Sequence, residues 1–164
     1  MTDTEVTEAD RAHLRRCVEL AAEAVAAGDE PYGSVLVGAD GTVLAEARNE
    51  VVTTGDATRH PEFELARWAA THVPAGERPA ATVFTSGEHC PMCSAAHGKV
   101  GLGRIVFATS AAQEVPWDAE FGVAPGRVPA QRITDVVPGL RADGPVAEFA
   151  EPMHDLHRRF HAGS

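Results

Sequence analysis

Segments typical of strands and of helices alternate through the middle of this 164-residue chain. Residues 81–85 and 104–108 are short apolar runs that indicate buried strands, and residues 62–71 and 92–100 are rich in helix-forming side chains. This alternation is typical of a sheet with parallel neighbouring strands covered by helices, and it predicts an α/β fold. In the first of these helices, four residues are available to face the sheet: Phe63, Ala66, Trp68 and Ala69.

The beginning of the chain predicts a helix followed by a β-hairpin. Residues 7–10 resemble a capping box, and apolar residues then recur every three or four positions until Gly28 supplies a stop. Further on, Asp40-Gly41 separates residues 34–37 from residues 42–45. Because Asp-Gly commonly joins two antiparallel strands, we expect a hairpin there.

The last third of the chain is rich in turn-forming residues. Residues 116–144 contain four prolines and several glycines, which predicts a long surface loop with at most one strand, at residues 133–137. Pro145 is expected to open a last helix over residues 145–161. With no internal repeat or linker, residues 1–164 are expected to form a single domain. One side of the last helix is apolar: Val146, Phe149, Met153, Leu156 and Phe160. Its end is basic and is expected to be a solvated face: His154, His157, Arg158, Arg159 and His161.

The charge balance limits the partners of the chain. Fourteen Lys and Arg against 24 Asp and Glu give a formal net charge of −10, which repels a phosphate backbone, so no nucleic-acid partner is favoured. Residues 1–5 are acidic and lack a signal-peptide pattern, and no apolar run reaches transmembrane length. We therefore expect a cytoplasmic protein that does not bind membranes.

Two short motifs, His60-Pro61-Glu62 and Cys90-Pro91-Met92-Cys93, each stand at the start of a predicted helix. One imidazole and two thiolates form a three-ligand zinc set that leaves a fourth tetrahedral position for water. The Cys-x-x-Cys spacing lets both sulfurs reach one ion from a single helix N-terminus, which also favours thiolates. Zn2+ is therefore the expected cofactor.

Glu62 lies two residues from the candidate ligand His60. It can therefore lie beside a water molecule that zinc activates, without having to bind the metal itself. This is the position that a proton shuttle requires. Attack on an amidine-like carbon, followed by loss of ammonia, is the chemistry that such an arrangement suits.

The combination of His-x-Glu with a later Cys-x-x-Cys resembles the signature of the cytidine deaminase superfamily. The similarity extends from about Pro31 to Phe107. Within the superfamily the chain looks most like guanine deaminases or the nucleoside deaminase branch, on residues 31–34, 49–54, 56–60 and 85–93. The resemblance implies a three-layer αβα sandwich with a mixed central sheet, assembled as a homodimer or larger oligomer.

The resemblance also implies roles for individual residues. Two acidic residues fall where guanine deaminases carry carboxylates near the base, namely Asp118 and Glu120, and His89 adds an ionisable group near the site. The implied zinc ligands are His60, Cys90 and Cys93, the implied proton shuttle is Glu62, and the implied substrate contacts are the Asn49 amide and the backbone around Ser34 and Val35.

The chain departs from the family pattern at two positions. Pro61 stands where the family usually has alanine, and its fixed φ fits the first position of a helix. His89 stands where the family usually has proline before the first cysteine. We expect Pro61 to adjust the local backbone geometry without inactivating the site. His89 adds an ionisable group, which bears on the choice of substrate.

Other interpretations of the same residues remain open. A redox dithiol has the same Cys-x-x-Cys spacing, and His97 could complete a closed, structural four-ligand zinc site with the three candidate ligands. His97 could equally face a pocket or be an ordinary histidine bonded to backbone. Asn49 could be a turn residue at a strand end. Cys17, among apolar positions of the first helix, is expected to be a buried thiol.

These observations favour zinc-dependent hydrolytic deamination of a nucleobase-type amine, with guanine or a related purine leading and cytosine or a triazine-like ring behind. A cytidine-type nucleoside and tRNA adenosine are alternative substrates, because the catalytic residues would be the same. From a different class, the chain could be a non-catalytic binding domain that zinc stabilises.

Overall fold

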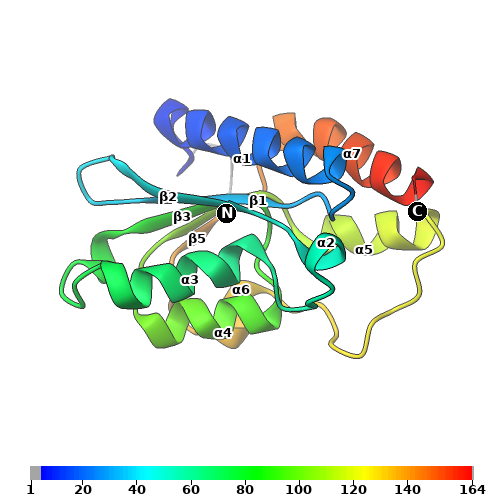
Figure 1. Cartoon of the computed structure of the whole chain (residues 1–164). Coiled ribbons are helices and arrows are strands. Elements are labelled where there is room, and N and C mark those ends of the chain that lie inside the picture. Colours follow the sequence, from blue (N-terminus) through cyan, green and yellow to red (C-terminus); the bar gives the residue numbers. More distant parts are fainter. Residues whose placement is uncertain (1–4, 164) are drawn as a thin grey trace.

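A computed structural model describes residues 5–163 as a five-stranded sheet between two layers of helices (Figure 1). The strands follow the order β2-β1-β3-β4-β5. Their bounds are β1 Gly33–Val37, β2 Val43–Arg48, β3 Thr82–Gly87, β4 Ile105–Thr109 and β5 Ala142–Asp143. β1 is antiparallel to β2 and β3, whereas β3, β4 and β5 are parallel. The expected αβα sandwich with a mixed central sheet is confirmed.

Helices cover both faces of the sheet. In Figure 1, α1 (Glu8–Ala26) and α7 (Ala150–Ala162) lie over one face, while α3 (Pro61–His72) and α4 (Pro91–Val100) lie over the other. Helix α5 (Ala111–Glu120) lies beside α7. The shorter helical segments are α2 Val51–Thr54, η2 Arg78–Ala80, α6 Ile133–Val136 and η3 Ala147–Phe149.

Two apolar layers hold the helices to the sheet. Under α1, the buried side chains of Leu14 and Cys17 pack with Val35 of β1. Under α3, Leu65 and Ala69 pack against the other side of β1 and β3. Cys17 is thus the buried thiol that its position predicts. The expected sheet-facing role of Phe63 is wrong, because Phe63 is only half-buried and Leu65 takes that place.

The first helix and the hairpin follow their sequence signals closely. Thr7 caps α1, with its hydroxyl accepting from the Asp10 amide at 3.1 Å, while Asp10 accepts from the Thr7 amide at 2.9 Å. These two bonds satisfy amides that an uncapped helix leaves without partners. Gly28, with φ of 91°, lies just beyond the helix end, and Asp40-Gly41 lies in the turn of the β1–β2 hairpin.

The region 116–144 is more ordered than its composition indicates. Helix α5 starts with a second capping box, formed by Ser110 and Gln113, and continues through Pro116 to Glu120. The strand expected at residues 133–137 is wrong. Those residues form the helical turn α6, in which the Val137 amide donates to the Ile133 carbonyl at 2.8 Å and only Ile133 is buried.

The last helix also differs from expectation. Pro145 does not open it; a 3₁₀ turn intervenes, and α7 begins at Ala150. Four of its five expected apolar residues are buried and Phe160 is half-buried. Its basic end is not uniformly solvated, since His157 is 1% exposed. Residues 1–4, on which the signal-peptide expectation partly rests, lie outside the described residues; within residues 5–163, no helix combines the length and apolarity needed to cross a membrane.

Helix α1 packs tightly against the sheet at Gly33. A Cβ there would overlap the Cβ of Leu20 and the carbonyl oxygen of Cys17. Gly33→Ala should therefore lower the free energy of unfolding by about 1–3 kcal/mol, the usual cost of overpacking. Gly76→Ala is the matched control, because a Cβ at Gly76 meets nothing within 4 Å. Urea unfolding measures both; equal stability of the two variants would contradict this packing.

Candidate functional site

Two helix starts place the candidate metal ligands next to one another. His60 is the N-cap residue of α3, with extended backbone angles (φ −82°, ψ 140°), and Pro61 is the first helical residue. Cys90 is the N-cap of α4, followed by Pro91, and its sulfur accepts from the Cys93 amide at 3.5 Å. Proline is favoured at the first helical position because its missing N–H has no helical partner there. Pro61 is therefore compatible with the site.

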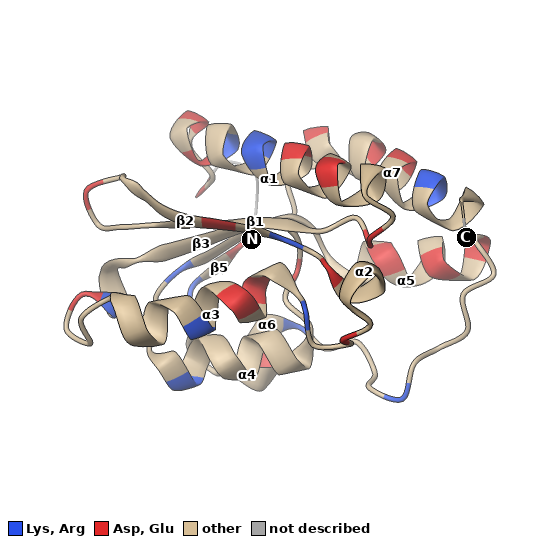
Figure 2. Ribbon diagram, in the orientation of Figure 1, with Lys and Arg blue, Asp and Glu red and all other residues tan. Residues whose placement is uncertain are grey.

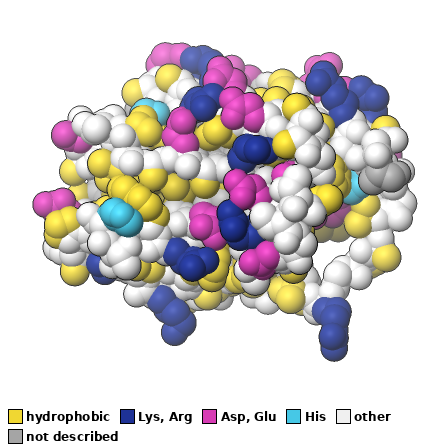
Figure 3. Space-filling model, in the orientation of Figure 1, with side chains coloured by type: hydrophobic (Ala, Val, Ile, Leu, Met, Phe, Trp, Pro, Cys, Tyr) yellow, Lys and Arg dark blue, Asp and Glu magenta, His cyan; other side chains and the backbone are white. Residues whose placement is uncertain are grey.

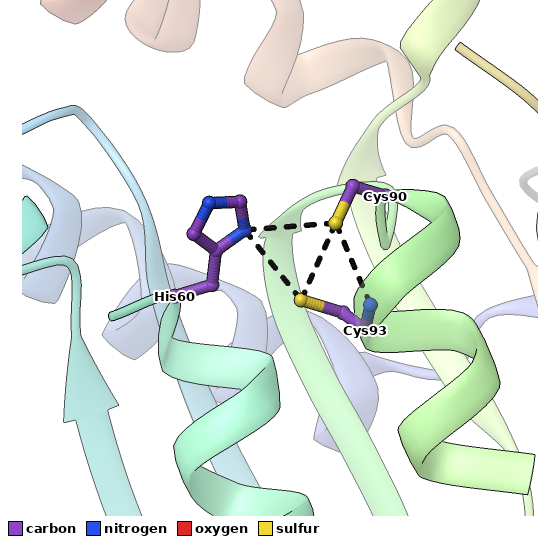
Figure 4. A group of neighbouring side chains, drawn as sticks. All are labelled: His60, Cys90 and Cys93. Atoms are coloured by element: carbon purple, nitrogen blue, oxygen red, sulfur yellow. Dashed lines mark hydrogen bonds between the residues drawn. The ribbon is translucent and has the colours of Figure 1, made fainter. Parts of the chain in front are cut away.

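The three side chains point toward one another (Figure 4). His60 Nδ1 lies 3.6 Å from Cys90 Sγ and 3.5 Å from Cys93 Sγ, and the two sulfurs are 3.5 Å apart. A tetrahedral zinc ion with bonds of about 2.3 Å to sulfur and about 2.0 Å to nitrogen separates its ligand atoms by about 3.5–3.8 Å. The distances and the donor set both fit Zn2+.

The environment also favours a thiolate in this set. The pKa of Cys90 is lowered to about 4, first because Cys93 donates to it and further because His60 does. The pKa of His60 is raised to about 9 by its contact with the Cys90 sulfur. An imidazole and a thiolate thus already attract each other at the position where both would bind a metal.

Glu62 lies beside this triad and is 5% exposed. Its Oε1 accepts from the Thr85 hydroxyl at 2.8 Å, and the Cys93 sulfur lies 3.9 Å from Oε2. Burial is the largest cause of its raised pKa, about 6. Ser34 donates to the Thr85 hydroxyl at 2.9 Å, so Ser34 supports Glu62 through Thr85.

A cavity of about 440 Å³ opens beside the triad and Glu62. It is strongly acidic: among the described residues that line it, none is Lys or Arg. Glu88, which lines the cavity, holds the start of α5 and the start of α6 together, because its carboxylate accepts from the Ala111 amide and from the Ile133 amide. The polar residues that line the cavity, besides His60 and Cys90 of the triad, are Glu30, Tyr32, Glu62, Glu88, His89, Glu114, Asp118 and Gln131.

Two of the expected substrate contacts, His89 and Asp118, do line the cavity. His89 is 1% exposed, and neither ring nitrogen has a hydrogen-bond partner among the described residues. Burial and the neighbouring His97 lower its pKa, so its ring is neutral. Asp118 on α5 is half-buried, and burial raises its pKa.

The other expected contacts lie outside the cavity lining. Val35 is fully buried in the core under α1, and Ser34 faces Thr85. Glu120 points away, with its carboxylate 2.9 Å from the His154 imidazole. These side chains are held by the core or by partners of their own.

Asn49 also lies outside the lining, where it has two local bonds. Its Oδ1 accepts from the Val51 amide at 2.9 Å, the turn geometry that was one interpretation of this residue. Its Nδ2 donates to the Glu30 carboxylate at 3.1 Å. Since Glu30 lines the cavity, Asn49 orients one of the cavity's carboxylates.

The rival four-ligand site does not form among the described residues, whose grouping around this position contains His60, Cys90 and Cys93 alone. His97 is buried, and its Nε2 donates to the Gly103 carbonyl at 2.7 Å. Its edge-to-face contact with the His89 ring, at 5.5 Å between centroids, supports that ring from behind. Of the roles considered for His97, the structure therefore shows the histidine that is hydrogen-bonded to backbone, and its side chain is buried.

Two residues of the cavity, Tyr32 and Glu114, are not identified by the sequence motifs. The Tyr32 hydroxyl donates to Glu114 Oε2 at 3.1 Å, and Thr109 Oγ1 lies 3.1 Å from Oε1. Thr109 has only one hydroxyl hydrogen and lies 2.9 Å from the Ser86 carbonyl, to which it can donate it. A protonated Glu114 then supplies the hydrogen for its contact with Thr109. The capping signature at Ser110 and Gln113 was the available signal, since it places Glu114 on a helix.

Burial explains why Glu114 holds this proton. Its carboxyl end packs so closely on Gly87 that a Cβ there would lie 2.5 Å from Oε1. Burial, followed by the charges of Asp118 and Glu62, raises the pKa of Glu114 to about 8. At neutral pH the cavity wall therefore carries a neutral acid next to the ionisable Glu62.

Comparison with known proteins agrees with this geometry. Residues 7–109 match the sequence family described as the cytidine and deoxycytidylate deaminase zinc-binding region. The chain is 42% identical over 81 residues to guanine deaminase of Bacillus subtilis, which covers 49% of this chain and 51% of that protein. It is 33% identical over 110 residues to a probable cytosine deaminase of Schizosaccharomyces pombe, covering 67% of this chain and 66% of that protein. The chain thus spans between about half and two thirds of these relatives.

A solved structure of guanine deaminase from Nitrosomonas europaea has the same fold. It matches with a TM-score of 0.68 at 19% identity, over 92% of this chain and 84% of that chain.

The proton on Glu114 predicts a pH dependence of stability. Between pH 4.5 and about 8 Glu114 keeps a proton in the folded chain that it releases in the unfolded chain, so its contribution to the free energy of unfolding falls as pH rises through this window. Glu114→Gln, a neutral isostere, should remove this loss, which is at most about 1.4 kcal/mol per pH unit. The variant should therefore gain stability relative to the wild type toward pH 8.

Urea unfolding at a series of pH values measures the difference between the two chains. Glu19→Gln, on the exposed side of α1, should follow the wild-type profile. If Glu114→Gln also follows the wild type throughout, Glu114 is not protonated in the folded chain.

Proposed function

We propose a function from one premise: this chain belongs to the cytidine and deoxycytidylate deaminase zinc-binding family. The proposed reaction is hydrolytic deamination of a free nucleobase, with guanine or a related purine as the favoured substrate. The observation that carries the proposal is the buried Glu62 carboxyl beside a zinc-fitting His-Cys-Cys triad, at the wall of an acidic cavity.

The residues divide the chemistry between them. His60, Cys90 and Cys93 would hold zinc, which when bound acidifies a coordinated water molecule and so supplies the nucleophile. Glu62 takes a proton from the attacking water and delivers it to the exocyclic nitrogen. Carbon–oxygen bond formation and carbon–nitrogen bond cleavage together convert amine and water into a carbonyl and ammonia. The Thr85 hydroxyl holds Glu62 in one orientation for both transfers.

The cavity lining favours an uncharged base that is rich in N–H donors. Carboxylates accept hydrogen bonds, and the guanine ring offers N–H groups at its edge. We propose that Asp118 accepts from the ring, that His89 contacts its polar atoms with a nitrogen free of protein partners, and that Tyr32 and Glu114 form the facing wall. The 42% identity to a guanine deaminase supports the same substrate.

A phosphate-bearing substrate fits this site poorly. Acidic positions recur along α5 (Figure 2). Two acidic residues of this helix, Glu114 and Asp118, line the cavity. The face seen in Figure 3 shows acidic and basic side chains interspersed, without a continuous basic patch. A tRNA or nucleotide would meet repulsion at the cavity. Cytosine is the second candidate, because the relative that aligns over 67% of the chain is a probable cytosine deaminase.

The proposal also covers the domain organisation, the cellular location and the oligomeric state of the chain. We expect one deaminase domain across the chain, working in the cytoplasm as a homodimer. The resemblance to the deaminase superfamily supports the dimer. Sedimentation equilibrium of the zinc-loaded chain measures the assembly, and a monomer would contradict it.

Glu62→Gln tests the proposed proton shuttle. The amide cannot carry the proton, so ammonia release from guanine should fall by ~10²–10⁴-fold, while zinc content and circular dichroism stay unchanged. Glu64→Gln is the matched control: its carboxylate faces Arg59 and Arg67, outside the cavity lining, and its activity should remain.

Full activity of Glu62→Gln would overturn the proposed shuttle. If the zinc-loaded wild type released no ammonia from guanine, cytosine, cytidine or aminotriazines, the proposal that the chain deaminates a small molecule would be wrong. Inosine formation in tRNA by the same sample would then identify the alternative substrate, and no turnover at all would favour the zinc-stabilised binding domain.

A further inference from the structure

A second group of metal-ligating side chains lies between helices α5 and α7. Asp118 belongs to α5, and His157 and His161 belong to α7. One ligand atom from each residue lies within 4.8 Å of the others. Two histidines four residues apart stand on the same face of a helix, a spacing that lets both bind one ion.

The burial of His157 is an independent indication that this group binds a ligand. His157 is 1% exposed, and its Nε2 is buried without a hydrogen-bond partner among the described residues. A buried imidazole nitrogen that remains unsatisfied costs free energy. The ring packs edge-on against the rings of Tyr32 and Trp117, with 5.4 Å and 5.5 Å between ring centroids, and these contacts hold it in place.

The protonation of His157 suits metal binding. Burial, followed by the charges of His161 and His154, lowers the pKa of His157 to about 4. The imidazole is therefore neutral at physiological pH, the form that binds metals. Two imidazoles and one carboxylate are a donor set for a divalent transition-metal ion.

We propose that Asp118, His157 and His161 form a second divalent-metal site, separate from the Cys-containing triad, which binds Zn2+ and fastens α5 to α7. Asp118 also lines the cavity, so an ion bound there draws its carboxylate away from that cavity. This consequence rests on the proposed function, in which Asp118 contacts the substrate. Excess zinc should then raise KM, which makes the second site inhibitory.

Metal titration of the full-length chain tests the site without relying on catalysis. After dialysis against saturating Zn2+ and desalting, the wild type should contain two zinc ions per chain. Asp118→Asn and His161→Gln, both at half-buried positions, should contain one. His154→Ala is the matched control on the same helix, because its imidazole faces Glu120, and it should contain two.

Cys93→Ser separates the two sites. It should lose the ion at the triad and retain one at Asp118, His157 and His161. Co2+ is a second probe: in Cys93→Ser with Cys90→Ser it should bind with a d–d spectrum and without a thiolate-to-cobalt charge-transfer band, because no cysteine remains near the site.

One zinc ion in the wild type, or two in Asp118→Asn and His161→Gln, would overturn the proposal. So would a Cys90→Ser, Cys93→Ser chain that binds no Co2+. These results do not depend on turnover. A chain with two zinc ions and no deaminase activity would keep the second site and refute the proposed function, whereas an active chain with one zinc ion would do the reverse.

Discussion

The site depends on the side-by-side starts of helices α3 and α4. Strands β3 and β4 run parallel with α4 between them, so Cys90 follows the carboxyl end of β3, where α/β folds place their ligands. Helix α3 packs on α4 and brings His60 to the same point. A shift by one helical turn, about 5.4 Å, would separate ligand atoms that now lie 3.5 or 3.6 Å apart.

Burial divides the roles of the carboxyl groups around the cavity. Burial raises the pKa of both Glu62 and Glu114. The charge of His60 opposes this rise at Glu62, whereas the charge of Asp118 adds to it at Glu114. Glu114 is shifted further, and it fills the hydrogen-bonding needs of Tyr32 and Thr109 as a neutral acid. The cavity can therefore be lined by several carboxyl groups without all of them being charged at neutral pH.

The sequence predicted the parts of the molecule that local rules determine. The capping box at Thr7, the Asp40-Gly41 hairpin turn and Pro61 at a helix start each depend on neighbouring residues only. The triad could be predicted because its ligands lie in two short motifs. The sequence did not predict the hydrogen bond between Tyr32 and Glu114, which are 82 residues apart, or the bond between Asn49 and Glu30. Contacts made by tertiary packing leave little trace in local spacing.

The region after Pro116 shows the same limit. The loop predicted for residues 116–144 takes in the second half of α5, and the basic end of α7 is predicted to be a solvated face. Only the packing of α5 on α7 reveals that His157 is buried beside Asp118. Helix propensity alone does not identify which face of a helix another helix will cover.

The proposed chemistry requires that one histidine and two cysteines hold a zinc ion and leave one coordination position open. A crystal structure of the zinc-loaded chain would show this arrangement. We expect zinc bound by His60 Nδ1, Cys90 Sγ and Cys93 Sγ, with a non-protein fourth ligand beside Glu62. A fourth protein ligand at this ion, such as His89 or His97, or no zinc at the triad, would contradict it.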